Sequence, residues 1–139
     1  MWPGMKIQPA FMATPQPETG FVMTVRTTTA SETFTLPTIT GFTYSATVDW
    51  GDGTIQSITA FDVNNAHTYA TAADYDIRIT GQFGCIRFNN GGDRLKVIEV
   101  KNLGIVGWQT TGLFGGLYGC SNMTSFVSGN TDTSATVTY

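Results

Sequence analysis

The chain has 139 residues and a mass of 15.0 kDa, the size of one domain that can bury a core without disulfides or metals. Charged residues make up only 12% of it, and the net charge of −3 argues against binding to nucleic acid or to acidic lipid. The 24 threonines and 16 glycines favour strands and tight turns, and they predict an all-β protein.

Residues 1–20 show neither helical nor strand periodicity, and their prolines predict an extended N-terminal arm. Four apolar residues of the arm either fold back on the domain or dock on a neighbouring chain: Trp2, Ile7, Phe11 and Met12. The arm lacks the apolar stretch of a signal peptide, and no window of the chain is apolar enough to insert in a membrane. We therefore expect a soluble chain that reaches an exterior by virus assembly and lysis, unless its leader is missing.

Alternation of apolar and polar residues begins at Phe21 and predicts short strands. Phe21, Met23 and Val25 form the expected inner face of a half-buried first strand. The predicted strands lie at residues 21–27, 32–36, 42–50, 54–59, 66–69, 74–80, 84–88 and 95–101. Residues 42–50 alternate most regularly and are expected to be a central strand, and "NNGGD" at 89–93 predicts a hairpin. Short strands separated by turns in this way predict a β-sandwich.

The stretch "VDWGDGT" at 48–54, followed by "HTYATAADYDIRITG" at 67–81, resembles the PKD-like module. Asp74 replaces the glycine that usually precedes the motif's tyrosine, here Tyr75. The resemblance covers about residues 21–81, and it implies an immunoglobulin-like sandwich.

A second resemblance involves "FGCIRFNNGGDRLKVIEVKNLG" at 83–104 and "LFGGLYGCSNMTSFVSGNTDTS" at 113–134, which look like the start of a BspA-like leucine-rich-repeat segment. About one repeat is present, whereas a solenoid needs roughly three or more. PKD-like modules joined to such repeats are typical of phage structural proteins and bacterial surface proteins, so the resemblance implies binding or architecture. We expect an arm at 1–20, a sandwich at 21–101 and a repeat-like extension at 102–139, whose apolar residues must pack on the sandwich or on another chain.

Asp49 and Asp52 flank Trp50 and Gly51, Gly53 follows them, and the two acids suggest a calcium site. The helix-loop-helix spacing fails, because the required ligand positions fall on glycines and an alanine. A looser site that adds Asp74 or Asp76 is the alternative. The favoured interpretation is a tight turn in which the carboxylates cap backbone N–H groups and the glycines supply unusual conformations.

The chain has one histidine and two cysteines, too few for a Cys/His zinc site. His67 is interpreted as a packed, hydrogen-bonded residue rather than a catalytic one. Cys85 and Cys120 form either one disulfide or two buried free thiols. The sequence predicts no catalytic residue, no cofactor and no metal.

Trp2, Trp108, Phe114 and Tyr118 are the candidate interaction surface, although core packing explains Trp108 and Phe114 about as well. The predicted function is a non-enzymatic exterior structural protein, a phage head decoration (cement) or tail-associated component. It would dock through both ends of the chain on other protein subunits, as a homo-oligomer or on a capsid or tail protein. The alternative is a cell-surface, secreted or tail adhesin that binds glycan or protein, and a hydrolase ranks third.

Overall fold

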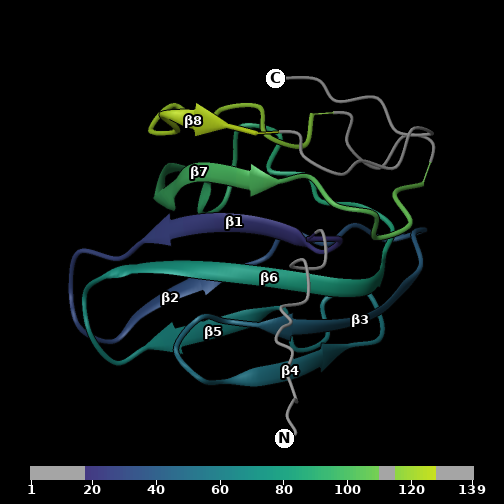
Figure 1. The fold of residues 1–139 in the computed structure, drawn as a ribbon, viewed down its shortest axis with the longest axis horizontal. Coiled ribbons are helices and arrows are strands. Elements are labelled where there is room, and N and C mark those ends of the chain that lie inside the picture. Colours follow the sequence, from purple (N-terminus) through teal and green to yellow (C-terminus); the bar gives the residue numbers. More distant parts are fainter. Residues whose placement is uncertain (1–17, 110–114, 128–139) are drawn as a thin grey trace, which may run out of the picture.

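The computed structural model describes residues 18–109 and 115–127 (Figure 1). Within these ranges the chain is all-β, with eight strands, one 3₁₀ turn (Arg94–Lys96) and no α-helix. The strands are β1 (Phe21–Arg26), β2 (Glu32–Thr35), β3 (Tyr44–Asp49), β4 (Ile55–Ile58), β5 (Ala66–Tyr69), β6 (Asp74–Phe83), β7 (Val97–Asn102) and β8 (Ser125–Phe126). A search of the same residues finds no helix with the length and apolarity needed to cross a membrane.

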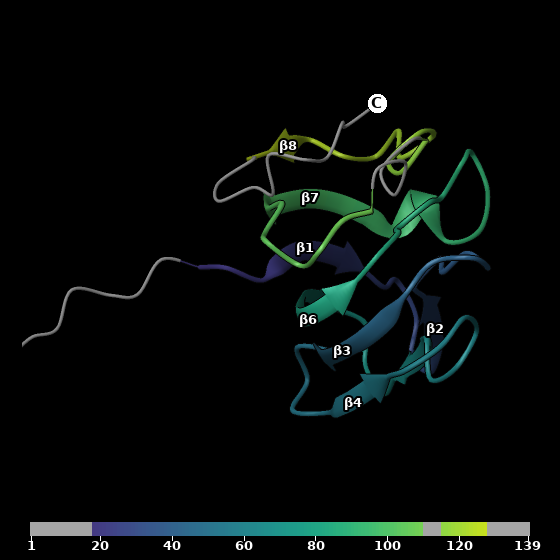
Figure 2. The ribbon, with the colours of Figure 1, turned by 90° about the vertical axis from the view of Figure 1, so that its right-hand side faces the viewer.

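The strands form two sheets that pack as a β-sandwich, which confirms the predicted fold class. The larger sheet has the order β4-β3-β6-β1-β7-β8, and the smaller one pairs β2 with β5 (Figures 1 and 2). Neighbouring strands are antiparallel except β7 and β8, which are parallel. Pro37 follows β2 closely, as expected for a residue that lacks a backbone donor.

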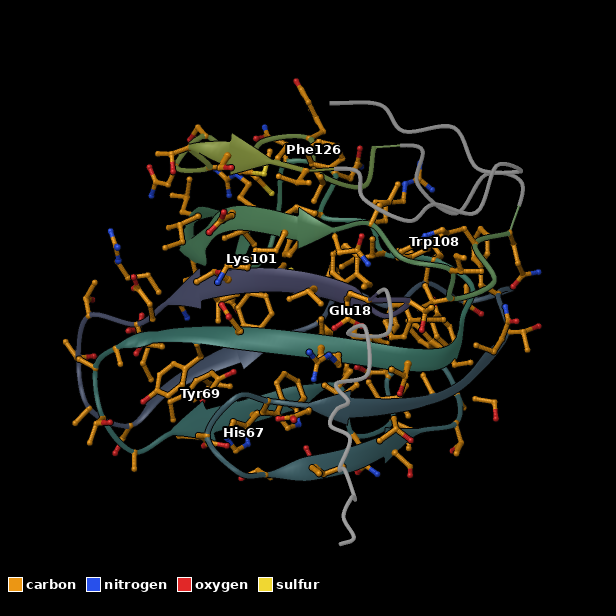
Figure 3. The ribbon with its side chains drawn as sticks, in the orientation of Figure 1. Glu18, His67, Tyr69, Lys101, Trp108 and Phe126 are labelled. Atoms are coloured by element: carbon orange, nitrogen blue, oxygen red, sulfur yellow. The ribbon has the colours of Figure 1, made fainter. Side chains whose placement is uncertain are left out.

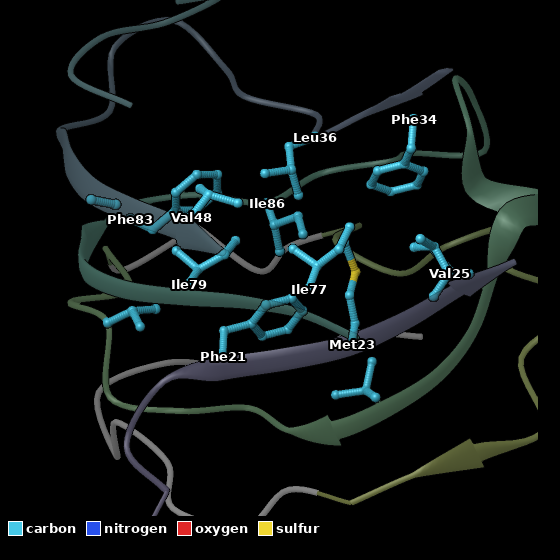
Figure 4. Packing of buried hydrophobic residues seen from close by; sticks show 14 of the residues in the cluster. Phe21, Met23, Val25, Phe34, Leu36, Val48, Ile77, Ile79, Phe83 and Ile86 are labelled. Carbon is cyan, nitrogen blue, oxygen red and sulfur yellow. The ribbon is translucent and has the colours of Figure 1, made fainter. Parts of the chain in front are cut away.

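One hydrophobic core lies between the sheets (Figure 4). Phe34 and Leu36, from β2 and the residue just beyond it, face Met23 and Ile77 of the large sheet, and all four are fully buried. The prediction for β3 is confirmed, because its inward residues Tyr44, Ala46 and Val48 are buried and the strand lies between β4 and β6.

The prediction that β1 is half-buried was wrong. Its expected outer-face residues Val22 and Thr24 are 7% and 5% exposed. The strand lies between β6 and β7, and polar side chains cover its outer face: the Thr24 hydroxyl donates to Asp76 Oδ1 at 2.7 Å, and Asp76 also binds Lys101. Alternation in one strand does not reveal what its neighbours place over it.

The predicted hairpin at residues 89–93 was also wrong. Asn89 and Asn90 have positive φ as expected for a turn, but residues 84–88 form no strand. Residues 88–90 instead donate backbone hydrogen bonds to carbonyls of residues 115–118, and β7 pairs with β1. The Asn-Gly chemistry therefore identifies the turn without identifying the partners of the flanking segments.

The described part of the repeat-like extension packs on the sandwich. Leu103, Val106, Trp108, Leu117 and Cys120 belong to the core cluster. β8 adds to the large sheet with Glu99 opposite Ser125 and Val100 opposite Phe126. Of the two routes the sequence left open, the sandwich itself covers these core residues, whereas Ile105, Tyr118 and Val127 of the extension stay exposed.

Candidate functional site

The acidic stretch after β3 is a tight turn, as predicted. Asp49 Oδ1 accepts the Gly51 N–H at 2.9 Å, and Asp52 Oδ1 accepts the Thr54 N–H at 3.0 Å. The Trp50 N–H donates to the Thr54 carbonyl at 3.0 Å and closes the turn. Both carboxylates thus cap backbone donors that the turn would otherwise leave without partners.

His67, on β5, is packed against this turn (Figure 3). Its ring stacks on Trp50 with centroids 5.2 Å apart, and it meets Tyr69 edge to face at 4.7 Å. Its Nε2 lies 2.7 Å from Asp52 Oδ2, and the side chain is 14% exposed. Desolvation raises the pKa of Asp52, but the hydrogen bonds from His67 and Thr54 outweigh it and lower the pKa overall. The pair ties the two sheets together, because Asp52 follows a strand of one sheet and His67 belongs to the other.

Trp50 anchors the cluster from inside the core, where it is fully buried. Its Nε1–H donates to Gln56 Oε1 at 2.7 Å, and its carbonyl accepts the Tyr69 hydroxyl at 2.8 Å. Desolvation raises the pKa of that hydroxyl far above its ordinary value. The cluster of acid, histidine, tryptophan and tyrosine is therefore packed together, and the Asp52 carboxylate, His67 Nε2, the Trp50 indole N–H and the Tyr69 hydroxyl are each hydrogen-bonded.

The other acids of the proposed calcium site are paired with cations across the outer face of the large sheet. Asp74 binds Arg26 at 2.7 Å, and Asp76 binds Lys101 at 2.8 Å. Among residues 18–109 and 115–127 there is no group of three or more acidic, cysteine or histidine side chains that could hold a metal ion. The structure therefore does not bring Asp49, Asp52, Asp74 and Asp76 together as ligands.

Sequence reasoning missed the role of the segment before β7. Asp93 Oδ2 accepts the Thr35 N–H at 2.8 Å, and Lys96 Nζ donates to the Thr33 carbonyl. Asp93 and Lys96 also pair with each other at 2.9 Å. These two side chains seal the outer edge of β2, and the only available signal was an acid and a base three residues apart after an Asn-Gly turn.

Two hollows lie on the described surface. The larger, about 470 Å³, is lined by Arg26, Thr28, Glu32, Leu95, Lys96, Ile98 and Asn122. The smaller, about 300 Å³, is lined by Glu18, Val22, Asp76, Arg78, Lys101 and Asn102. Figure 3 shows Glu18 and Lys101 on the outer face of the large sheet. Neither lining includes an aromatic side chain, which is the usual platform for stacking on a sugar.

The predicted interaction residues fall in different places. Trp108 is 3% exposed and meets Phe21 edge to face at 5.5 Å, so it is a core residue. Tyr118 is 52% exposed and remains a surface candidate. The other five lie outside the described residues: Trp2, Ile7, Phe11, Met12 and Phe114.

Cys85 and Cys120 are free thiols, and both are buried. Burial raises the pKa of each to about 11, although nearby arginines act in the opposite direction. Of the two alternatives for these cysteines, the structure has the unbridged one, and neither thiol is activated as a nucleophile.

Comparisons of the chain with protein-family models, curated protein sequences and solved structures find no match.

Proposed function

We propose that this chain is a non-enzymatic structural protein on the exterior of a phage particle, as a head decoration (cement) or tail-associated component. In this proposal the sandwich is of the immunoglobulin-like, PKD-like kind and acts as a rigid spacer. Its N-terminal arm (residues 1–20) and C-terminal segment (residues 102–139) dock on neighbouring capsid or tail subunits.

The observation that supports this proposal most is that the histidine and most of the described acids make contacts within the sandwich itself. The one histidine is held between Trp50 and Asp52. The acids that join cations or cap backbone groups are Glu18, Glu32, Asp49, Asp52, Asp74, Asp76 and Asp93. These partners lie within the sandwich itself, which is the arrangement that the proposed role as a rigid spacer requires.

Low charge on the surface is compatible with a particle coat. Threonine is the commonest polar residue, and three of the described cations pair with acids: Arg26 with Asp74, Arg78 with Glu18 and Lys101 with Asp76. Tyr118 is the described member of the predicted interaction set that stays exposed, and Tyr is a residue type that anchors interfaces.

The test is to locate the chain on phage particles purified from its source culture, by mass spectrometry and by immunogold electron microscopy. We expect stoichiometric amounts on the exterior of heads or tails. A chain that is missing from purified particles but abundant in the cell envelope or the medium would contradict the proposal.

The rival proposal is an adhesin, and the larger hollow is the observation that favours it. The hollow combines polar groups with Leu95, which is 46% exposed, and so has the mixed character of a small-ligand site. Binding on a glycan array that is lost in a Leu95→Arg variant would favour the adhesin. Turnover of a substrate that is abolished by His67→Ala would contradict both proposals.

A further inference from the structure

β4 is an edge strand of the large sheet. Among the described residues it pairs with β3 and with no other strand, in a register that places Asp49 opposite Ile55 and Ala46 opposite Ile58. An unpaired strand edge presents a row of N–H and C=O groups to which another strand can add.

The register shows which backbone groups of β4 face outward. The Trp50 N–H donates to the Thr54 carbonyl, so residues 50 and 54 form a hydrogen-bonded pair. Hydrogen-bonded pairs alternate along an antiparallel ladder, so Gln56 and Ile58 also point their backbone groups toward β3. The N–H and C=O groups of Ile55 and Ser57 therefore point to the open edge.

This edge lacks the protection that β2 receives. Asp93 and Lys96 seal β2, whereas the sequence of β4, Ile-Gln-Ser-Ile, contains no charge and no proline. One outward group has a partner, since the Asn64 amide donates to the Ser57 carbonyl at 3.1 Å. A carbonyl oxygen has a second lone pair, so it can accept another donor as well.

Exposed apolar side chains gather beside the same edge. Ile55 is 64% exposed on the outer face of the strand. Phe61 and Val63, in the loop after β4, are 49% and 40% exposed. The bond from Asn64 to Ser57 shows that this loop turns back toward the strand. Monomeric proteins protect their strand edges with charges, prolines or covering segments, and exposed apolar patches mark interaction sites. An uncharged edge that is bordered by exposed apolar side chains is therefore a pairing site.

We propose that β4 pairs edge to edge with β4 of a second copy of this chain, antiparallel across a two-fold axis that passes near Gln56. In this arrangement the N–H and C=O of Ile55 meet the C=O and N–H of Ser57 from the second copy, and the reverse. The two Ile55 side chains lie diagonally across the axis on the outer face, within reach of each other. No like charges meet there, because the strand has none.

A second copy fits this edge better than a foreign strand does, because a two-fold contact is self-complementary and needs no other sequence to match it. The contact is short, since β4 has four residues. A contact of this size is smaller than the interface of a permanent dimer, so we expect a weak, reversible dimer. The inference does not rest on the proposed function, because the purified chain alone tests it.

Amide hydrogen exchange at two protein concentrations tests the pairing directly. The Gln56 and Ile58 amides, which bond to β3, should be protected at both concentrations. The Ile55 and Ser57 amides should exchange rapidly in dilute protein and become protected in concentrated protein. Rapid exchange of both at every concentration would overturn the proposal, as would protection that does not depend on concentration, since the edge would then be covered within the chain.

Sedimentation equilibrium of two variants supplies the matched comparison. Ile55→Lys places two like charges near the axis and should weaken dimerisation at least about tenfold. Ile105→Lys is the control, because Ile105 is 54% exposed and follows β7, which three strands of the sheet separate from β4. It should dimerise like the unaltered chain. Equal weakening by both variants, or dimerisation that Ile55→Lys leaves unchanged, would assign the contact to another surface and overturn the proposal.

Discussion

Two glycines of the WGDGT turn should differ sharply in their tolerance of alanine. Gly51 and Gly53 have similar positive φ angles of 87° and 95°, so alanine is strained at either position by about 1–2 kcal/mol. A Cβ on Gly53 would meet no atom within 4 Å. A Cβ on Gly51 would lie 2.5 Å from the carbonyl oxygen of Asp76, a backbone atom of β6 that cannot rotate away.

Gly51→Ala should therefore add an overpacking cost of about 1–3 kcal/mol to the strain that it shares with Gly53→Ala. We expect Gly53→Ala to lower the free energy of unfolding by about 1–2 kcal/mol and Gly51→Ala to lower it by about 3 kcal/mol or more. Urea unfolding followed by tryptophan fluorescence measures both. Equal destabilisation would show that the approach of the turn to β6 does not constrain Gly51, and the reasoning would be refuted.

Three further predictions concern polar groups of the sandwich. Because the folded-state pKa of Asp52 is lowered, the stability that its carboxylate contributes is present at neutral pH and is lost as the pH falls through that pKa. Asp52→Asn should therefore be less stable than the unaltered chain at pH 7 and should lose less stability on acidification. A parallel pH dependence of the two urea midpoints would contradict this, and so would a His67→Ala variant of unchanged stability. Cys85 and Cys120 should react with a thiol reagent only on unfolding, because both are buried with pKa values raised to about 11; a mass two hydrogens lower than that of the reduced chain would reveal a disulfide instead. Asp93→Ala should cost about 1–3 kcal/mol in urea unfolding because it leaves a part-buried N–H of β2 without its partner, and an unchanged midpoint would refute the sealing role.

The sequence was sufficient to predict the strands that bury one face and expose the other. In β3, Tyr44, Ala46 and Val48 alternate with polar residues because one face meets the core and the other meets solvent. The burial of Trp50, one residue beyond that strand, also follows from its position in the alternating pattern. Local chemistry was likewise sufficient to predict the turn after β3, because Asp side chains cap backbone N–H groups and Gly residues adopt positive φ angles.

Pairing between distant segments was not predictable from local pattern. Val22 reads as an outer-face residue, and its burial depends on neighbours from β6 and β7. The segment at residues 84–88 reads as a strand because it is apolar, yet its backbone bonds go to separate loops and not to a ladder. The stack of His67 on Trp50 had a weak signal, because both residues belong to the resemblance but no spacing rule joins them.

The edge strands differ in how they are protected from pairing with another chain, and this difference bears on assembly. A chain with only seven basic residues cannot protect every edge with charge, so the placement of those residues is informative. Lys96 acts at β2 together with Asp93, and Lys101 and the two arginines of the outer sheet face are engaged with acids. β8 limits its own edge by its length of two residues. β4 has neither the charged contacts of β2 nor the short length of β8, and its Ile55 is 64% exposed.

If edge protection were unimportant for this protein, the Asp93 and Lys96 contacts to β2 would have no reason to coincide with the outward-pointing backbone groups of that strand. We therefore interpret the bare edge of β4 as a pairing surface and expect its amides to report that pairing.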